Sequence, residues 1–270
     1  MGVPVHGMMI VGPTSVSSQH WPEMAKRILA VWAAFSCALL LANAAHADSL
    51  RWPQPGGLGT PVVLTYSFSN LLDQRLSGAI TEADIRASTA EAFGLWSDYV
   101  PLHFIERSDS GPSPSDAEYG PGNHPNIRIG YHFVDDETTL AHAFLPVATD
   151  VSGLAGDIHI NSTSAFAWSV GSGFPTIDFL EVITHEIGHS LGVGHILYAD
   201  AIMQPYLSNR FRGRGTAYLL EPDILAIRSL YGSGVGSVQP MPEPSTMVLL
   251  ATGLAIALLG RRRMRRHQSH

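Results

Sequence analysis

The residues best suited to chemistry lie between positions 185 and 195, where the sequence reads HEIGHSLGVGH. His185 and His189 are four residues apart, so on a helix their imidazoles lie one turn above each other and can share an ion. Gly192 lets the chain leave the helix through a left-handed conformation, which returns His195 as a third ligand. Three neutral histidines leave one coordination position open, as in a catalytic zinc site. The alternative is a pair of solvated helix histidines, which leaves the glycines and the third histidine as coincidence.

Glu186 follows the first of these histidines and is the candidate general base. A zinc ion with an open position lowers the pKa of its bound water and polarises a carbonyl oxygen. Glu186 would take the proton from that water and pass it to the leaving amine. The segment therefore predicts hydrolysis through a zinc-bound water activated by Glu186.

The elements that must hold this site follow from hydrophobic periodicity and from capping residues. A helix opens at Thr81, a second runs from Asp178 to Leu191, and a third runs from Pro222 to Tyr231. Strands are predicted at residues 62–68, 102–105, 127–133, 140–145 and 157–160. In the third strand apolar residues alternate with Arg128, Gly130 and His132, which predicts one polar face. This order indicates an α/β or α+β sheet packed on helices.

Charge and cysteine content narrow the class of protein. The net charge is −7, and because basic residues gather near the C-terminus, the central part is more acidic still. This distribution argues against nucleic acid as a partner. The single cysteine, Cys37, lies in an N-terminal apolar stretch, so no disulfide is expected in the folded domain.

Both ends of the chain resemble targeting segments. Residues 1–47 are predicted to be a signal peptide cleaved before Asp48, with Met24 as a possible true start; the alternative is a membrane anchor. The expected folded domain covers residues 48–232, and a Gly/Ser/Val linker follows at 233–241. Residues 242–270 contain a Pro-Glu-Pro triplet, a short apolar run and terminal arginines. That run is shorter than the ~30 Å hydrocarbon core of a bilayer.

This C-terminal pattern resembles the PEP-CTERM sorting signal of Gram-negative bacteria. The resemblance implies processing by an exosortase-type enzyme and release of the domain outside the cell or on its outer surface. The membrane is expected to contact the chain only through the two terminal signals. A permanent transmembrane anchor is the alternative.

The histidine pattern resembles that of the metzincins, whose methionine turn is matched by residues 201–205 with Met203 at its centre. Within that group the chain is similar to the matrixins, over segments from Arg51 to Gly232. The resemblance implies a twisted, mostly parallel five-stranded sheet with one antiparallel edge strand, packed on three helices. It also implies a secreted zinc endopeptidase acting on polypeptides. The alternative from another class is a cell-surface or biofilm-matrix binding protein that uses an inactive metzincin fold.

By the same resemblance, a peptide substrate pairs with the edge strand that contains Ala141 and Ala143. Pro205 and Tyr206 would form a wall of the main pocket. Glu181 matches a position on the pocket floor, where a carboxylate favours a basic or long polar residue after the cut; a solvated helix charge is the alternative.

Matrixins also hold a structural zinc through three histidines and an aspartate. His142 and His159 match two of these positions, His132 is the third candidate, and Asp135 or Asp136 is the candidate carboxylate. A solvated His132 is the alternative. Asp157 matches a calcium ligand, whereas Asn161 and Ser164 replace the usual carboxylates, so a single weakened calcium site is expected.

Overall fold

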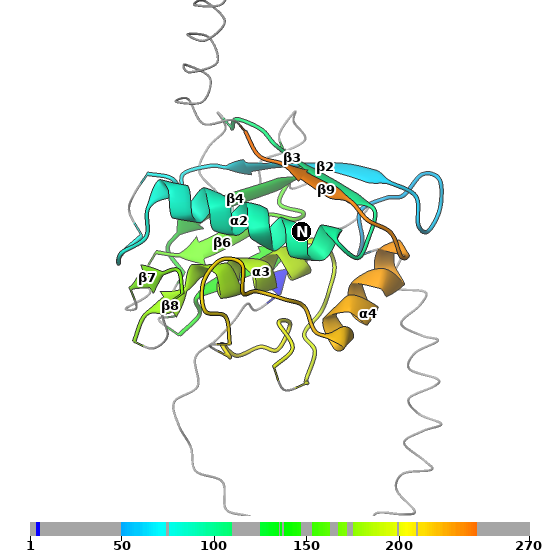
Figure 1. Cartoon of the computed structure of the whole chain (residues 1–270). Helices are drawn as coiled ribbons and strands as arrows, with labels where there is room; N and C mark the ends of the chain where they lie inside the picture. Colours follow the sequence, from blue (N-terminus) through cyan, green and yellow to red (C-terminus); the bar gives the residue numbers. More distant parts are fainter. Residues whose placement is uncertain are drawn as a thin grey trace, which may run out of the picture. The chain divides into compact units, whose positions relative to one another are not determined.

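Two helices, packed against each other, lie along one face of a mostly parallel sheet (Figure 1). The computed structural model describes residues 4–5, 50–73, 76–109, 125–134, 136, 138–146, 153–162, 167–171, 175–198, 200–208 and 210–241. The chain divides into two compact units, Met1–Gln239 and Pro240–His270, and the elements below belong to the first. Apart from Pro4–Val5, the predicted signal peptide lies outside the described residues, as does the predicted sorting tail.

The five predicted strands form the centre of this sheet. They are β2 (Val62–Phe68), β3 (Leu102–Glu106), β4 (Ile127–His132), β5 (Ala141–Phe144) and β6 (Ile158–Asn161). The spatial order is β5-β6-β4-β2-β3, with β5 antiparallel to β6 and the other pairs parallel. The expectation of a mostly parallel sheet with one antiparallel strand is therefore confirmed.

Two short strands extend the predicted sheet. β9 (Ser237–Gln239) pairs in parallel with β3, although its residues fall within the segment expected to be a linker. β1 (Pro4–Val5) pairs antiparallel with the outer side of β5. The sequence suggested that β5 is the outermost strand. Among the described residues, however, the two-residue strand β1 lies beyond it. A separate pair is formed by β7 (Trp168–Ser169) and β8 (Ile177–Asp178).

The three predicted helices are present as α2 (Glu82–Ser97), α3 (Phe179–Ser190) and α4 (Glu221–Tyr231). Thr81 caps α2 in a reciprocal arrangement with Asp84, which satisfies backbone donors at the helix start. α2 packs against α3, and α3 packs against β5 and β6. Apolar side chains from the sheet and these helices fill one core, in which Trp96 and Phe93 are fully buried.

Arg128 departs from its expected place on a polar strand face. Only 1% of this residue is exposed, and its Nε lies 2.6 Å from the carboxylate of Asp109, whose side chain is 3% exposed. Its Nη2 donates to Ser69 at 3.1 Å. These polar partners allow the charged side chain of Arg128 to be buried in the sheet. Its polar residue type therefore did not imply exposure to solvent.

Candidate metal centres

All twelve residues of α3 are buried, and this helix carries the first candidate centre. The side chain of Asp178 caps its start by accepting a hydrogen bond from Leu180 N at 2.9 Å. The helix ends at Ser190, and Gly192 has a φ of +96°, the left-handed conformation that the sequence predicted. The turn brings His195 next to the histidines of α3.

His185, His189 and His195 lie close enough to share one ion. One ligand atom from each is within 4.8 Å of the others, and the three rings have centroid separations of 4.7 to 5.4 Å. His185 and His189 are fully buried, and His195 is the least buried of the three. Glu186, also fully buried, follows His185 on the same helix.

Backbone carbonyls fix the orientation of the two helical histidines. His185 Nδ1 lies 2.7 Å from Ile202 O, and His189 Nδ1 lies 2.7 Å from Val193 O. Because a carbonyl oxygen only accepts, each Nδ1 carries the hydrogen, and the lone pair of each neutral ring lies on Nε2. Both Nε2 atoms are buried without a hydrogen-bond partner among the described residues. Two buried lone pairs beside a third histidine fit a zinc ion.

The electrostatic environment keeps these imidazoles neutral. Burial lowers the pKa of His189 to about 4, and the neighbouring His195 contributes in the same direction. Burial also holds the pKa of His185 well below its usual value, with a smaller contribution from His189. Neutral imidazole is the form that binds a metal, so the site is ready to accept a cation at neutral pH.

Met203 lies against the helix that carries the histidines. A side-chain Cβ at Gly188 would be 2.3 Å from Met203 Sδ and 2.8 Å from the Trp96 ring, so only glycine allows this approach. Met203 is fully buried.

Asp223, on α4, holds this turn, a role for which the sequence offered no local signal. Its Oδ2 accepts hydrogen bonds from Ile202 N at 3.0 Å and Leu220 N at 3.1 Å, and its Oδ1 accepts one from Met203 N at 3.2 Å. Ile202 is also the residue whose carbonyl orients His185. Asp223 therefore supports the first centre through the backbone of the turn.

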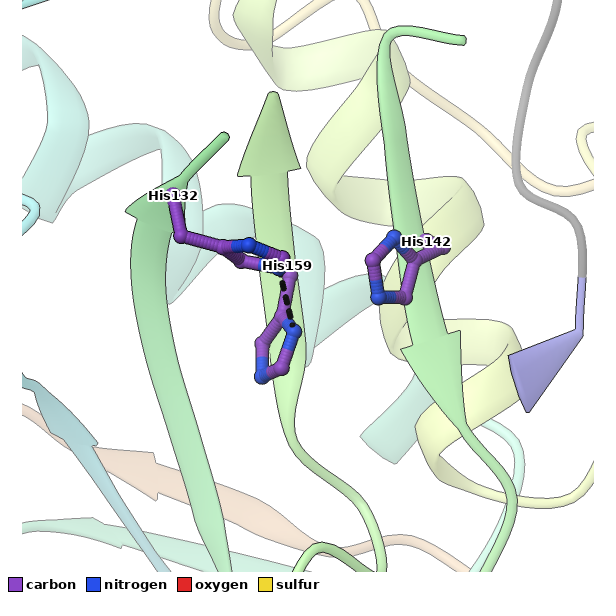
Figure 2. A group of neighbouring side chains, drawn as sticks. All are labelled: His132, His142 and His159. Atoms are coloured by element: carbon purple, nitrogen blue, oxygen red, sulfur yellow. Dashed lines mark hydrogen bonds between the residues drawn. The ribbon is translucent and has the colours of Figure 1, made fainter. Parts of the chain in front are cut away.

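A second histidine group lies on the sheet face opposite the helices. His132, His142 and His159 come from three neighbouring strands and direct their rings toward one another (Figure 2). One ligand atom from each is within 4.8 Å of the others. His132 Nε2 and His159 Nδ1 are hydrogen-bonded at 2.8 Å. Two nitrogens on a tetrahedral zinc are about 3.3 Å apart, so zinc binding through these atoms requires a small separation of the two rings.

The candidate carboxylates do not join this group among the described residues. Asp135 lies outside them. Asp136 accepts hydrogen bonds from Thr138 N, Thr138 Oγ1 and Thr139 Oγ1, and these bonds lower its pKa to about 2. Asp136 thus stabilises its own turn and is not part of the histidine group. The sequence predicted that the three histidines would lie together, but it did not predict that Asp136 would accept hydrogen bonds within its own turn.

The candidate calcium residues have protein partners. Asp157 is fully buried, and its Oδ1 accepts a hydrogen bond from Arg128 N at 2.9 Å. Asn161 Nδ2 donates to two carbonyl oxygens, Asp136 O and Thr139 O, both at 2.8 Å. An amide nitrogen therefore contacts two backbone oxygens of the loop between β4 and β5.

The candidate substrate residues lie on β5, on α3 and directly after the methionine turn. Ala141 and Ala143 are fully buried on β5, and Ala143 is in register with Val5 of β1. Tyr206 is exposed after the methionine turn, with Pro205 before it. Glu181 is fully buried and accepts hydrogen bonds from Ser208 N at 2.8 Å and Ser208 Oγ at 2.6 Å. It is therefore not a solvated helix charge.

Comparison with known proteins identifies the class to which this fold and these sites belong. The family model described as Matrixin matches residues 59–232, and the model of the PEP-CTERM protein-sorting motif matches residues 242–266. The chain therefore belongs to the matrixin family.

Similar proteins include a plant, a bacterial and a human member. The chain is 31% identical to metalloendoproteinase 4-MMP of Arabidopsis thaliana over 213 residues, which are 78% of the chain and 56% of that protein. It is 34% identical to karilysin of Tannerella forsythia over 157 residues, 58% of the chain and 30% of that protein. It is 35% identical to human matrilysin over 144 residues, 53% of the chain and 49% of that protein. The chain thus spans at most 56% of the length of these three relatives.

Within the described part of the chain, no helix combines the length and the apolar character needed to cross a bilayer.

Proposed function

We propose that this chain is an exported zinc-dependent endopeptidase. The observation that carries the proposal is the convergence of His185, His189 and His195, with ligand atoms within 4.8 Å of one another, beside the buried Glu186. Membership of the matrixin family and the similarity to metalloendoproteinase 4-MMP support it. Zinc, when bound by these histidines, supplies Lewis-acid polarisation of a carbonyl group and a lowered pKa for water.

The chain's own residues supply the proton transfers. Glu186 accepts the proton of the attacking water and then donates it to the nitrogen of the leaving amine, which prevents recombination of the products. Burial of the glutamate shields the transfer from bulk water. The hydrogen bonds to Ile202 O and Val193 O keep two imidazoles in the tautomer that the site requires.

The substrate is proposed to be an extended polypeptide that pairs with the outer side of β5. The antiparallel pairing of β1 with Phe144 and Ala143 supports this, because an extended segment occupies the same backbone groups. Tyr206 and Pro205 are proposed to line the pocket for the residue after the cut, with Glu181 at its floor. Removal of residues 1–47 by signal-peptide cleavage would free the edge of β5.

A structural zinc is proposed at His132, His142 and His159, and calcium at Asp157. Export is proposed to end with recognition of the PEP-CTERM motif by an exosortase-type enzyme, at the cell surface of a Gram-negative bacterium. Cleavage of the tail then releases the domain, whereas a retained tail would anchor it.

Glu186→Gln tests the proposed mechanism. We expect the variant to retain the zinc content of the wild type while its kcat/KM on casein falls by a factor of about 10² to 10⁴. Glu82→Gln, a matched change of an exposed glutamate on α2, should leave the rate unchanged. Metal analysis of the same samples should give two zinc ions per chain. A value of one zinc ion per chain would refute the proposed site at His132, His142 and His159.

The test also separates the enzyme from a binding protein with an inactive fold. A wild-type chain that binds zinc but hydrolyses neither casein nor gelatin would support the binding protein. A Glu186→Gln variant with the wild-type rate would show that the base is misassigned.

A further inference from the structure

Two backbone carbonyls at the end of α3 are bound by side chains from distant parts of the chain. The last carbonyls of a helix lack partners within the helix and need other donors when they are buried. Trp52 Nε1 donates to Ser190 O at 3.0 Å, and the Tyr231 hydroxyl donates to Leu191 O at 2.9 Å. These two carbonyls directly precede Gly192, where the chain turns toward His195.

The two donors are also bound to each other. Trp52 N donates to the Tyr231 hydroxyl at 3.0 Å, so this oxygen accepts one hydrogen bond and donates another. Tyr231 is fully buried, and burial raises the pKa of its hydroxyl above the usual value, which keeps the proton in place for donation. We call Trp52 and Tyr231 the end-of-helix pair.

Neighbouring contacts fix this pair on both sides. Arg51 Nη1 donates to Leu230 O at 2.9 Å, and Gln54 Nε2 donates to Tyr231 O at 3.1 Å. The Trp52 ring lies so close to Gly156 that a Cβ there would be 2.6 Å away. The segment before β2 is therefore anchored to α4 and to the turn that precedes β6.

The backbone of the same segment lies against the turn itself. A Cβ at Gly192 would be 2.1 Å from Leu50 O, so the turn and the segment before β2 are in direct contact. His185 and His189 are oriented by α3 and by their own bonds to Ile202 O and Val193 O. The place of His195 depends in addition on the path of the chain after Ser190.

We propose that Trp52 and Tyr231 are positioning residues that hold the turn after α3 and thereby place His195 for zinc. The inference rests on the proposed function, because His195 is a zinc ligand only within it. Cleavage of the signal peptide before Asp48, as predicted, would leave both residues in the mature chain. Their side chains donate to the backbone carbonyls of Ser190 and Leu191, so their effect is on geometry rather than on chemistry.

The test uses the full chain with single changes that remove one donor each. Tyr231→Phe deletes the hydroxyl, and Trp52→Phe deletes the indole N–H while keeping an aromatic ring. Zinc affinity is measured by competition with a fluorescent chelator, with zinc alone as the probe. Loss of supporting bonds around a metal site weakens binding 10- to 100-fold, and we expect about 10-fold for each variant. Tyr66→Phe is the matched control, because Tyr66 is an equally buried tyrosine on β2.

A double-mutant cycle with His195→Ala separates positioning from general destabilisation. If the pair acts through His195, Tyr231→Phe should not weaken zinc binding further once His195 is absent. Equal effects in both backgrounds, or a lower Tm with unchanged zinc affinity, would overturn the inference. A wild-type chain without zinc binding at the first site would instead refute the proposed function.

Discussion

Replacement of Asp223 by asparagine should loosen the methionine turn and weaken the whole domain. The carboxylate accepts three backbone hydrogen bonds, two at Oδ2 and one at Oδ1. An asparagine that keeps its oxygen at the Oδ2 position retains the bonds from Ile202 and Leu220 but directs an amide nitrogen at Met203 N. The buried Met203 N–H is then left without an acceptor, and the N–H groups of Ile202 and Leu220 face a neutral oxygen in place of a charged one. The expected loss of unfolding free energy is about 2 to 3 kcal/mol.

Thermal unfolding measures this loss. For a domain of this size, about 1 kcal/mol corresponds to about 2 to 4 °C, so Asp223→Asn should lower the Tm by about 5 to 10 °C. Asp84→Asn is the matched control, since Asp84 caps α2 at a partly exposed position and should cost less than about 1 kcal/mol. Because Ile202 O orients His185, zinc affinity should fall as well. A Tm within about 1 °C of the wild type would refute the argument that Asp223 supports the turn.

Three further outcomes are expected. Asn161→Asp places a carboxylate against the carbonyl oxygens of Asp136 and Thr139, so the Tm of the variant should be lower than that of the wild type. Millimolar calcium should raise the Tm of the variant more than that of the wild type, and a variant that does not respond to calcium would contradict this. In the metal-free protein, burial lowers the pKa of His189 from 6.5 to about 4, so the folded state binds a proton less readily than the unfolded state. The free energy of unfolding should therefore decline by about 3 kcal/mol as the pH falls from 6.5 to 4. Urea unfolding at several pH values measures this decline, and His189→Gln should reduce it. Glu181→Leu should shift the residue preferred after the cut from basic or long polar to aliphatic in cleavage profiling; a wild-type profile with aliphatic residues alone would exclude a role for the carboxylate.

Local patterns in the sequence were sufficient for most of the fold. The apolar run at Val62–Phe68 and the capping residues Thr81 and Asp84 produce the elements expected of them, because burial and hydrogen bonding at these positions depend on near neighbours. The histidine spacing also predicted that His185, His189 and His195 would meet, since helix geometry and one glycine determine it. Such features are determined by a few adjacent residues.

What the sequence did not predict depends on partners far away along the chain. Arg128 is buried because Asp109 provides a counter-charge, and no periodicity reveals that pairing. The strand β9 forms because β3 offers an edge to residues that otherwise resemble a linker. Trp52 binds a carbonyl group 138 positions away along the chain. Asp223 binds two backbone amides that lie 21 and 20 positions away. Tertiary contacts of this kind override local preference.

The contact of Gly188 with Met203 and Trp96 has a consequence for how this protein can change. Since hydrogen is the only side chain that fits at position 188, the spacing between α3, the turn and α2 is fixed by atoms already in contact. A smaller residue in place of Trp96 would therefore let α3 shift, and with it the proposed zinc ligands His185 and His189. Variants that repack this part of the core should alter heat resistance and metal retention together, so selection on either property constrains the other.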